Sequence, residues 1–289
     1  MFKNITLKEL VKQTWREILR QNALGRAAEL AYYFLLALFP LLIFLLSFIT
    51  FLPGAQETIL TWLSQVMPRD ALRIVNNWVE NVFSNRSGGL LSFGFLFALF
   101  SASAGMGALM NALNDVYEIS EGRPFWKSRL IALGLTIVLS LMVIGGTVLV
   151  TFGDRIAAWI ERLSGVEGAF GPVTTAMRYV IGLGMLELGI QTVYYFAPNV
   201  KQKWKWITPG AVFAVIAFVA TSFGFSLYLR FAPGYDATYG SLGAVVVLML
   251  WLYLMGLILV IGGEINAEIE KAAGIIPEEK EHAETAEVS

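Results

Sequence analysis

Polar side chains inside long apolar blocks are the residues of this chain best placed to do chemistry. Glu187 lies within two residues of the centre of the block 174–197. Gly184, Gln191 and Tyr194 share its helical face, at positions i−3, i+4 and i+7. A carboxyl at mid-bilayer costs about 2.5–3.5 kcal/mol on insertion scales and marks a functional site by default. Two interpretations stay open. In one, Glu187 binds a cation or proton, or lines a water-filled cavity; in the other, it is a protonated carboxyl that hydrogen-bonds to a neighbouring helix.

A second polar stripe runs along the apolar block 90–113. It contains Asn111 and Asn114, and Asp115 follows at the end of the helix. Small residues at four-residue spacing in the same block favour close packing against another helix. Helix packing and a role in binding are therefore both open for these three residues.

Further polar candidates lie where the first block begins and the last block ends. Arg26 and Glu29 are one turn apart, a spacing typical of an interfacial ion pair of little stabilising weight. Glu264 and Asn266 follow the last block and are predicted to lie on the same side of the membrane.

Several kinds of chemistry lack the residues they need. The chain has no cysteine and one histidine, His282, in a polar tail. Zinc and two-metal hydrolysis depend on several such ligands converging on one point, so we predict no metal site and no cofactor. A net charge of −1 gives no basic surplus for nucleic acid. We therefore predict that the protein is not an enzyme, and we reject ribonuclease activity.

The elements that carry these residues are predicted to be membrane-spanning helices. The chain has 289 residues, of which 56% are hydrophobic and 15% charged, far from the composition of a soluble domain. Six apolar blocks are each long enough to cross about 30 Å of hydrocarbon. They cover approximately residues 30–52, 90–113, 130–152, 174–197, 209–231 and 242–263. We expect an all-α integral membrane protein.

The remaining segments are predicted to lie at the membrane surface or in water. Residues 1–29 contain a basic amphipathic helix, Thr6–Gln21, of the kind that lies along lipid headgroups. Two short amphipathic helices, 56–67 and 70–84, follow the first block, and a similar stretch surrounds Ile156 and Ile160. A tight loop is expected around Asp236 before the last block. The transmembrane domain spans 30–271, and the acidic tail 272–289 is predicted to be disordered.

The distribution of basic residues predicts the orientation. Fourteen Lys and Arg residues fall in the amino-terminal segment, the second and fourth connections and the tail, against seven on the opposite side. The positive-inside rule then places both termini in the cytoplasm of a bacterial inner membrane.

Several motifs resemble the YihY/BrkB family of bacterial inner-membrane proteins. They are Arg26-Ala-Ala-Glu-Leu-Ala-Tyr-Tyr-Phe, Phe39-Pro-Leu-Leu, Asn111-Ala-Leu-Asn-Asp-Val-Tyr, Glu121-Gly-Arg-Pro-Phe-Trp, Tyr239-Gly-Ser-Leu-Gly-Ala and Gly262-Gly-Glu-Ile-Asn-Ala-Glu. The resemblance covers about residues 5–272 and implies a six-helix membrane fold. Relatives have carried the label ribonuclease BN, and transport of lipids or other amphiphiles has been suggested for some. The resemblance supplies no catalytic residues.

Two functions remain as hypotheses. The first is a transporter, exporter or flippase of a lipid or other amphiphile, favoured by Glu187 and the polar stripes. The second is a membrane scaffold or regulatory protein whose stripes serve helix association alone. The expected partners are the lipid bilayer and such an amphiphile, without nucleic acid; an oligomer is open.

Overall fold

The computed structural model describes residues 7–50, 56–57, 83, 88–164, 171–200, 202–231 and 235–274. The regular elements of this part of the chain are helices. They are α1 (Leu7–Arg20), α2 (Ala23–Ile49), α5 (Gly88–Val116), α6 (Phe125–Ser164), α7 (Gly171–Phe196), α8 (Pro209–Phe231) and α9 (Tyr235–Ala272). The described chain divides into two compact units, one of residues 33–102 and one of residues 1–32 and 103–289.

The smaller unit contains the later part of α2 and the first part of α5. Phe44 of α2 and Phe95 of α5 bring their ring centroids within 5.4 Å, at a tilted angle. Phe93 and Phe97, one turn apart on α5, stack at 5.7 Å. Aromatic contacts of this kind add to the packing of the two helices.

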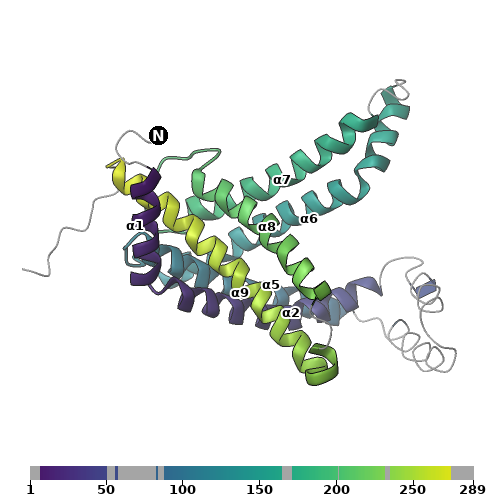
Figure 1. Ribbon diagram of the computed structural model, residues 1–289. Coiled ribbons are helices and arrows are strands. Elements are labelled where there is room, and N and C mark those ends of the chain that lie inside the picture. The colour runs from purple at the N-terminus through teal and green to yellow at the C-terminus, as the bar shows by residue number, and fades with distance from the viewer. Residues whose placement is uncertain are drawn as a thin grey trace, which may run out of the picture. The chain divides into compact units, whose positions relative to one another are not determined.

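In the larger unit, α6 and α7 form a long antiparallel hairpin (Figure 1). Small residues let the two backbones approach. A Cβ built on Gly146 would lie 3.5 Å from the carbonyl oxygen of Gly182. A Cβ on Gly189 would lie 3.0 Å from Leu139. Close approach at small residues is the usual way in which helices pack inside a membrane.

Helices α8 and α9 form a second hairpin, closest at two glycines. A Cβ added to Gly262 of α9 would lie 2.7 Å from the carbonyl oxygen of Gly210 on α8. A Cβ added to Gly210 would in turn overlap the carbonyl oxygen of Gly262. Neither position accepts a larger residue without moving a backbone.

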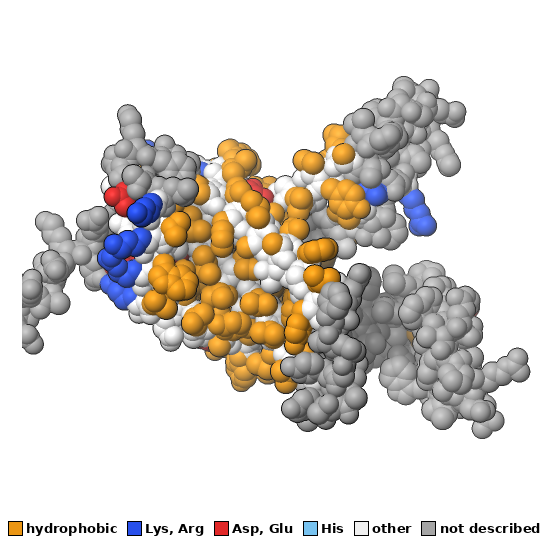
Figure 2. All heavy atoms as spheres, viewed as in Figure 1, with side chains coloured by type: hydrophobic (Ala, Val, Ile, Leu, Met, Phe, Trp, Pro, Cys, Tyr) orange, Lys and Arg blue, Asp and Glu red, His pale blue; other side chains and the backbone are white. Residues whose placement is uncertain are grey.

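Helix α1 packs against α9 and keeps an apolar stripe exposed. Leu10 and Ile18 are buried, whereas Val11, Trp15 and Leu19 are exposed. Figure 2 shows Lys and Arg side chains gathered around α1, and hydrophobic side chains over the faces of α8 and α9. Exposed apolar side chains beside basic ones suit a helix at the boundary between lipid and water. The predicted helix Thr6–Gln21 is confirmed over Leu7–Arg20.

Five described helical segments are long and apolar enough to cross a membrane. They are Ala23–Leu41, Leu91–Val116, Phe125–Val150, Pro209–Tyr228 and Val245–Ala272. They overlap five of the six predicted blocks. The remaining block, 174–197, is helical in α7, but Glu187 and Gln191 lower its hydropathy and it is not among the five segments found in the described residues. Six spans and both termini in the cytoplasm stay predictions.

Two predicted boundaries were wrong. Helix α6 continues unbroken to Ser164, so the stretch around Ile156 is not a separate helix; no proline interrupts the chain there. Helix α9 begins at Tyr235, so Asp236 is helical rather than in a loop, since an acidic residue in the first turn interacts favourably with the helix dipole. The predicted helices 56–67 and 70–84 and the acidic tail from residue 275 lie mainly or wholly outside the described residues.

Local capping explains where several helices begin and end. Asn22 adopts φ 53°, which ends α1, and its Oδ1 accepts a hydrogen bond from the Gly25 backbone at 3.3 Å, which starts α2. Thr208, directly before Pro209, has the same role for α8: its carbonyl accepts from Val212 at 3.0 Å.

Candidate functional site

Most of the ion pairs found among the described residues of the larger unit lie where four segments meet. These are α1 with the start of α2, the connection 117–124, the connection 197–208 and the last turns of α9. We call this region the α1 end. Hydrogen bonds and ion pairs join all four segments there, although they are far apart in the sequence.

Glu118 is central to the α1 end. Its carboxylate accepts from the ammonium of Lys271 on α9 at 3.0 Å and pairs with the guanidinium of Arg20 on α1. Arg20 also donates to Glu17 at 2.5 Å, and Lys271 lies 3.3 Å from Glu268. One carboxylate thus connects α1 with α9.

The backbone places Glu118 by an uncommon conformation. Glu118 has φ 55°, a left-handed region that a residue other than glycine rarely adopts. The Ile119 amide donates to the Asn114 carbonyl and the Glu118 amide to the Asp115 carbonyl, both at 2.9 Å, which completes a Schellman cap of α5. A glycine would fit this position with less strain, but it would lack the carboxylate that pairs with Arg20 and Lys271.

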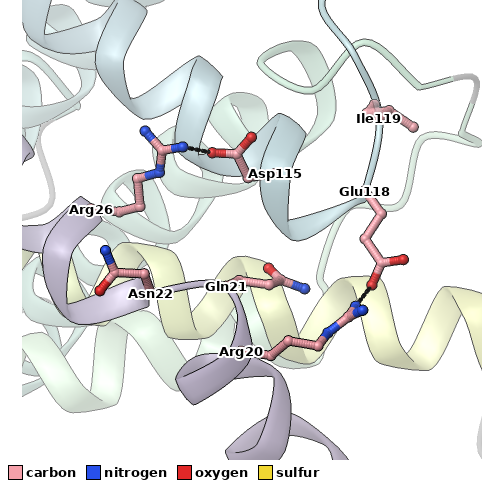
Figure 3. Close-up of a pocket in the computed structure, with 7 residues that line it drawn as sticks. All are labelled: Arg20, Gln21, Asn22, Arg26, Asp115, Glu118 and Ile119. Atoms are coloured by element: carbon pink, nitrogen blue, oxygen red, sulfur yellow. Dashed lines mark hydrogen bonds and ion pairs between the residues drawn. The ribbon is translucent and has the colours of Figure 1, made fainter. Parts of the chain in front are cut away.

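A shallow pocket of about 400 Å³ opens at the turn between α1 and α2 (Figure 3). It is lined by Arg20, Gln21, Asn22, Arg26, Asp115, Glu118 and Ile119. Two guanidinium groups and two carboxylates therefore face the same space, and their charges cancel. Such a lining suits a polar group that carries both signs of charge.

Arg26 connects the predicted interfacial pair to the stripe on α5. Its guanidinium donates to Glu29 at 3.1 Å, so the predicted ion pair is present, and it also pairs with Asp115. All three side chains are more than a third exposed. Pairs with that exposure contribute little to stability.

The stripe predicted along α5 is divided in the structure. Asn111 is exposed, whereas Asn114 is buried and hydrogen-bonded through both its nitrogen and its oxygen. The Asn114 amide donates to Glu121 at 3.1 Å, and its oxygen accepts from the Asn199 backbone at 2.7 Å. Asn114 therefore ties the connection 117–124 to the connection 197–208, which is a packing role.

Glu121 and Arg123 strengthen the same junction. Arg123 donates to both carboxylate oxygens of Glu121, at 2.7 and 2.6 Å, and to the carbonyls of Phe196 and Ala197 at the end of α7. These bonds from Arg123, with the bond from Asn114, lower the pKa of Glu121 to about 2.

A buried network joins α7, α8 and α9 one turn deeper. Thr208 donates to Gln191 at 2.5 Å and accepts from the Asn266 amide at 3.0 Å. The Asn266 oxygen accepts from the Gly210 backbone at 2.8 Å. Tyr194, 2% exposed, donates to the Leu259 carbonyl at 2.8 Å. Gln191, Tyr194 and Asn266 thus have structural partners.

Glu187 differs from the other polar residues of its stripe. It lies one turn before Gln191 on α7 and is partly exposed. Its Oε1 is buried and has no hydrogen-bond partner among the described residues. Within the predicted stripe, Gln191 and Tyr194 thus have partners, whereas this oxygen of Glu187 has none among the described residues.

Glu264 is another carboxyl with such an oxygen, as are Asp115 and Glu270 among the described residues. It lies on α9 at the α1 end, 1% exposed, and its Oε1 has no hydrogen-bond partner in the described part of the chain. The structure thus brings Arg26, Asp115 and Glu264 to one end, whereas Glu187 lies deeper along α7.

Sequence reasoning missed Thr208, Glu118 and Lys271. Thr208 could have been found, because a threonine before a proline is a helix-start signal. Glu118 and Lys271 are charged residues in polar segments, so their type and position in the sequence do not distinguish them. Only the fold brings them to their partners.

Residues 14–288 match the protein family described as virulence factor BrkB. The chain belongs to this family. The resemblance seen in the motifs is thereby confirmed, and the BrkB match covers the α1 end from Glu17 to Lys271. The chain is a multi-pass membrane protein of this family.

Three relatives illustrate the similarity. A Bacillus subtilis (strain 168) protein, which carries the name putative ribonuclease-like protein YfkH, is 38% identical over 258 residues, which cover 89% of this chain and 94% of that protein. A UPF0761 membrane protein of Alkalilimnicola ehrlichii is 29% identical, with 85% and 54% covered. One of Tolumonas auensis is 24% identical, with 88% and 83% covered. No solved structure matches the chain.

Proposed function

We propose that this BrkB-family protein moves a lipid or another amphiphile across the bacterial inner membrane, and that Glu187 lines the route. The observation that carries the proposal is the carboxyl oxygen of Glu187, which is buried without a partner in the described residues. A polar group in hydrocarbon is costly unless it binds something. A passing polar headgroup, a proton or water would supply what the neighbouring helices do not.

The position of Glu187 supports the same proposal. Further toward the α1 end, Gln191 and Tyr194 bind α7 to Thr208 and to α9. Glu187 is the first polar residue of this face beyond those contacts, where the side chain becomes partly exposed. The hydrogen bonds of Gln191 and Tyr194 would hold α7 to α8 and α9 at the α1 end. Beyond them, beside the unsatisfied carboxyl of Glu187, the α6–α7 and α8–α9 hairpins could separate around a substrate.

The proposal places the α1 end in the cytoplasm. Basic residues are concentrated in the segments that meet there, in agreement with the positive-inside rule. The mixed charges of the pocket lined by Arg20, Arg26, Asp115 and Glu118 suit the headgroup layer. The exposed stripe of α1, which includes Trp15, would lie in the same layer.

A scaffold or regulatory protein is the second candidate. The specific observation in its favour is the network of Thr208, Gln191, Asn266 and Gly210, in which each polar group serves helix association. In a scaffold, neutralising Glu187 would change neither folding nor phenotype.

We propose further that the chain is not a ribonuclease, although the name of the Bacillus subtilis relative suggests one. The proposal is supported by the sequence, in which one tail histidine and no cysteine are available for metal or acid–base chemistry. Incubation of the purified protein with structured and unstructured RNA would test this, and cleavage that follows the protein through purification would refute it.

Lipid exchange between leaflets tests the transport proposal. The purified protein is reconstituted into vesicles that contain fluorescent phospholipid analogues, and the fraction of analogue accessible to an external quencher is followed with time. We expect exchange with the wild type and at least a tenfold loss in rate with Glu187→Gln. The tenfold loss corresponds to about 1.4 kcal/mol, a modest value for a buried polar contact.

Glu29→Gln is the matched control. It removes a carboxyl of similar partial exposure that is paired with Arg26 outside the proposed route, so it should leave exchange unchanged. No exchange above that of empty vesicles with the wild type would refute lipid movement. Equal rates for wild type and Glu187→Gln would remove Glu187 from the route.

A further inference from the structure

The carboxyl of Glu264 lies closed off inside the α1 end. Its side chain is 1% exposed and is among the largest fully buried side chains of the described residues. The two glycines before it allow the closure, since a Cβ on Gly263 would overlap Leu113 and one on Gly262 would overlap Tyr194. The Oε1 atom has no hydrogen-bond partner in the described part of the chain.

The charged groups that act electrostatically on Glu264 come from three segments. Glu268 and Lys271 lie on the same helix, Glu17 comes from α1, and Glu118 from the connection 117–124. Three of these four groups are carboxylates. Each of these three carboxylates disfavours a negative charge on Glu264.

The basic groups of this cluster already have partners. The Lys271 ammonium is 3.0 Å from Glu118 and 3.3 Å from Glu268, and Arg20 pairs with Glu17 and Glu118. No hydrogen bond or ion pair joins either of them to Glu264 in the described structure. With four carboxyls and two basic side chains, the cluster has more acidic groups than it can neutralise.

We infer that Glu264 is a proton-binding site, which holds a proton while the neighbouring carboxylates stay ionised and paired. A buried carboxylate without a partner is costly, and a proton removes that cost. A metal ion fits less well, because it needs several oxygen ligands and the oxygens of Glu118 and Glu268 already accept from Lys271. The inference does not depend on transport.

Release of the proton has a structural consequence. It would put an uncompensated negative charge between α9 and the segments that carry Glu17 and Glu118. Repulsion would then loosen α1 from α9. Proton binding at Glu264 therefore controls how firmly α1 is docked.

Infrared spectroscopy of the full-length protein in detergent tests the site directly. At neutral pH, the wild-type spectrum minus the Glu264→Gln spectrum should contain the C=O stretching band of one protonated carboxyl. The spectrum of Glu29→Gln, the control, should keep that band. A difference spectrum that contains only the bands of an ionised carboxylate would overturn the inference.

Hydrogen exchange provides a second readout if Glu264→Gln folds poorly by circular dichroism. In the wild type, the amides of α1 should lose protection as the pH rises, by at least tenfold beyond the change in intrinsic exchange rate. The same comparison with Glu29→Gln should give an equal loss. Protection that stays constant from neutral to alkaline pH would overturn the inference.

Discussion

Replacement of Gly210 by alanine should destabilise the protein through a single contact between two helices. The new methyl group would overlap the carbonyl oxygen of Gly262 on α9. Because a backbone atom cannot rotate away as a side chain can, α8 must shift from α9. The shift would also stretch the bond from the Gly210 amide to Asn266, which is 2.8 Å in the wild type.

The magnitude follows from three contributions. Overpacking of a well-packed contact costs about 1–3 kcal/mol. Loss of the bond to Asn266 costs about 1 kcal/mol. Alanine is favoured over glycine within a helix by roughly 0.5–1 kcal/mol, which acts in the opposite direction. We therefore expect Gly210→Ala to lower the free energy of unfolding by about 2 kcal/mol.

The matched control is Gly224→Ala on the same helix. A Cβ at Gly224 meets no atom within 4 Å, so only the helix preference changes and the variant should be as stable as the wild type or slightly more stable. Both variants would be measured by equilibrium unfolding in mixed micelles with increasing dodecyl sulfate. A Gly210→Ala variant within about 0.5 kcal/mol of the wild type would refute the reasoning, since that is less than any single overpacking cost.

Two further predictions concern polar groups. Arg123 holds the pKa of Glu121 at about 2, below its ordinary value of 4.5, so the stabilisation from their bonds is fully present above pH 4.5 and is lost as the pH falls to 2. Denaturation measured across this range should show a smaller loss for Glu121→Gln than for the wild type, and equal losses would contradict the assignment. Tyr194→Phe removes only the bond to the Leu259 carbonyl. It should cost about 0.5–1.5 kcal/mol by the same unfolding assay and leave lipid exchange unchanged, whereas exchange lost without a stability change would make Tyr194 part of the route.

The described helices could largely be predicted from the sequence, because the signals are local. The apolar block predicted at 209–231 is α8 with the same bounds, since Thr208 and Pro209 define its start. The errors occurred where local signals are weak. No proline separates the end of α6 from its apolar part, and one helical run therefore replaced the two segments expected.

The candidate site was predicted less well, because a polar residue in an apolar block has the same sequence signature whether or not it is satisfied. Gln191, Tyr194 and Glu187 occupy one helical face, yet Gln191 and Tyr194 have partners on other segments and the Oε1 of Glu187 has none in the described structure. Those partners follow in the chain by 17 residues for Gln191 and 65 for Tyr194. No periodicity reports such pairing.

By itself, the sequence determined that the chain is helical and belongs in a membrane, because hydrophobic length is a property of each segment alone. Only the tertiary structure decided which charges meet. Glu118 is 98 residues from Arg20 and 153 from Lys271, and it joins them because three helix ends converge at one place. The same convergence surrounds Glu264 with carboxylates, since the environment of a buried group is set by segments distant in the chain.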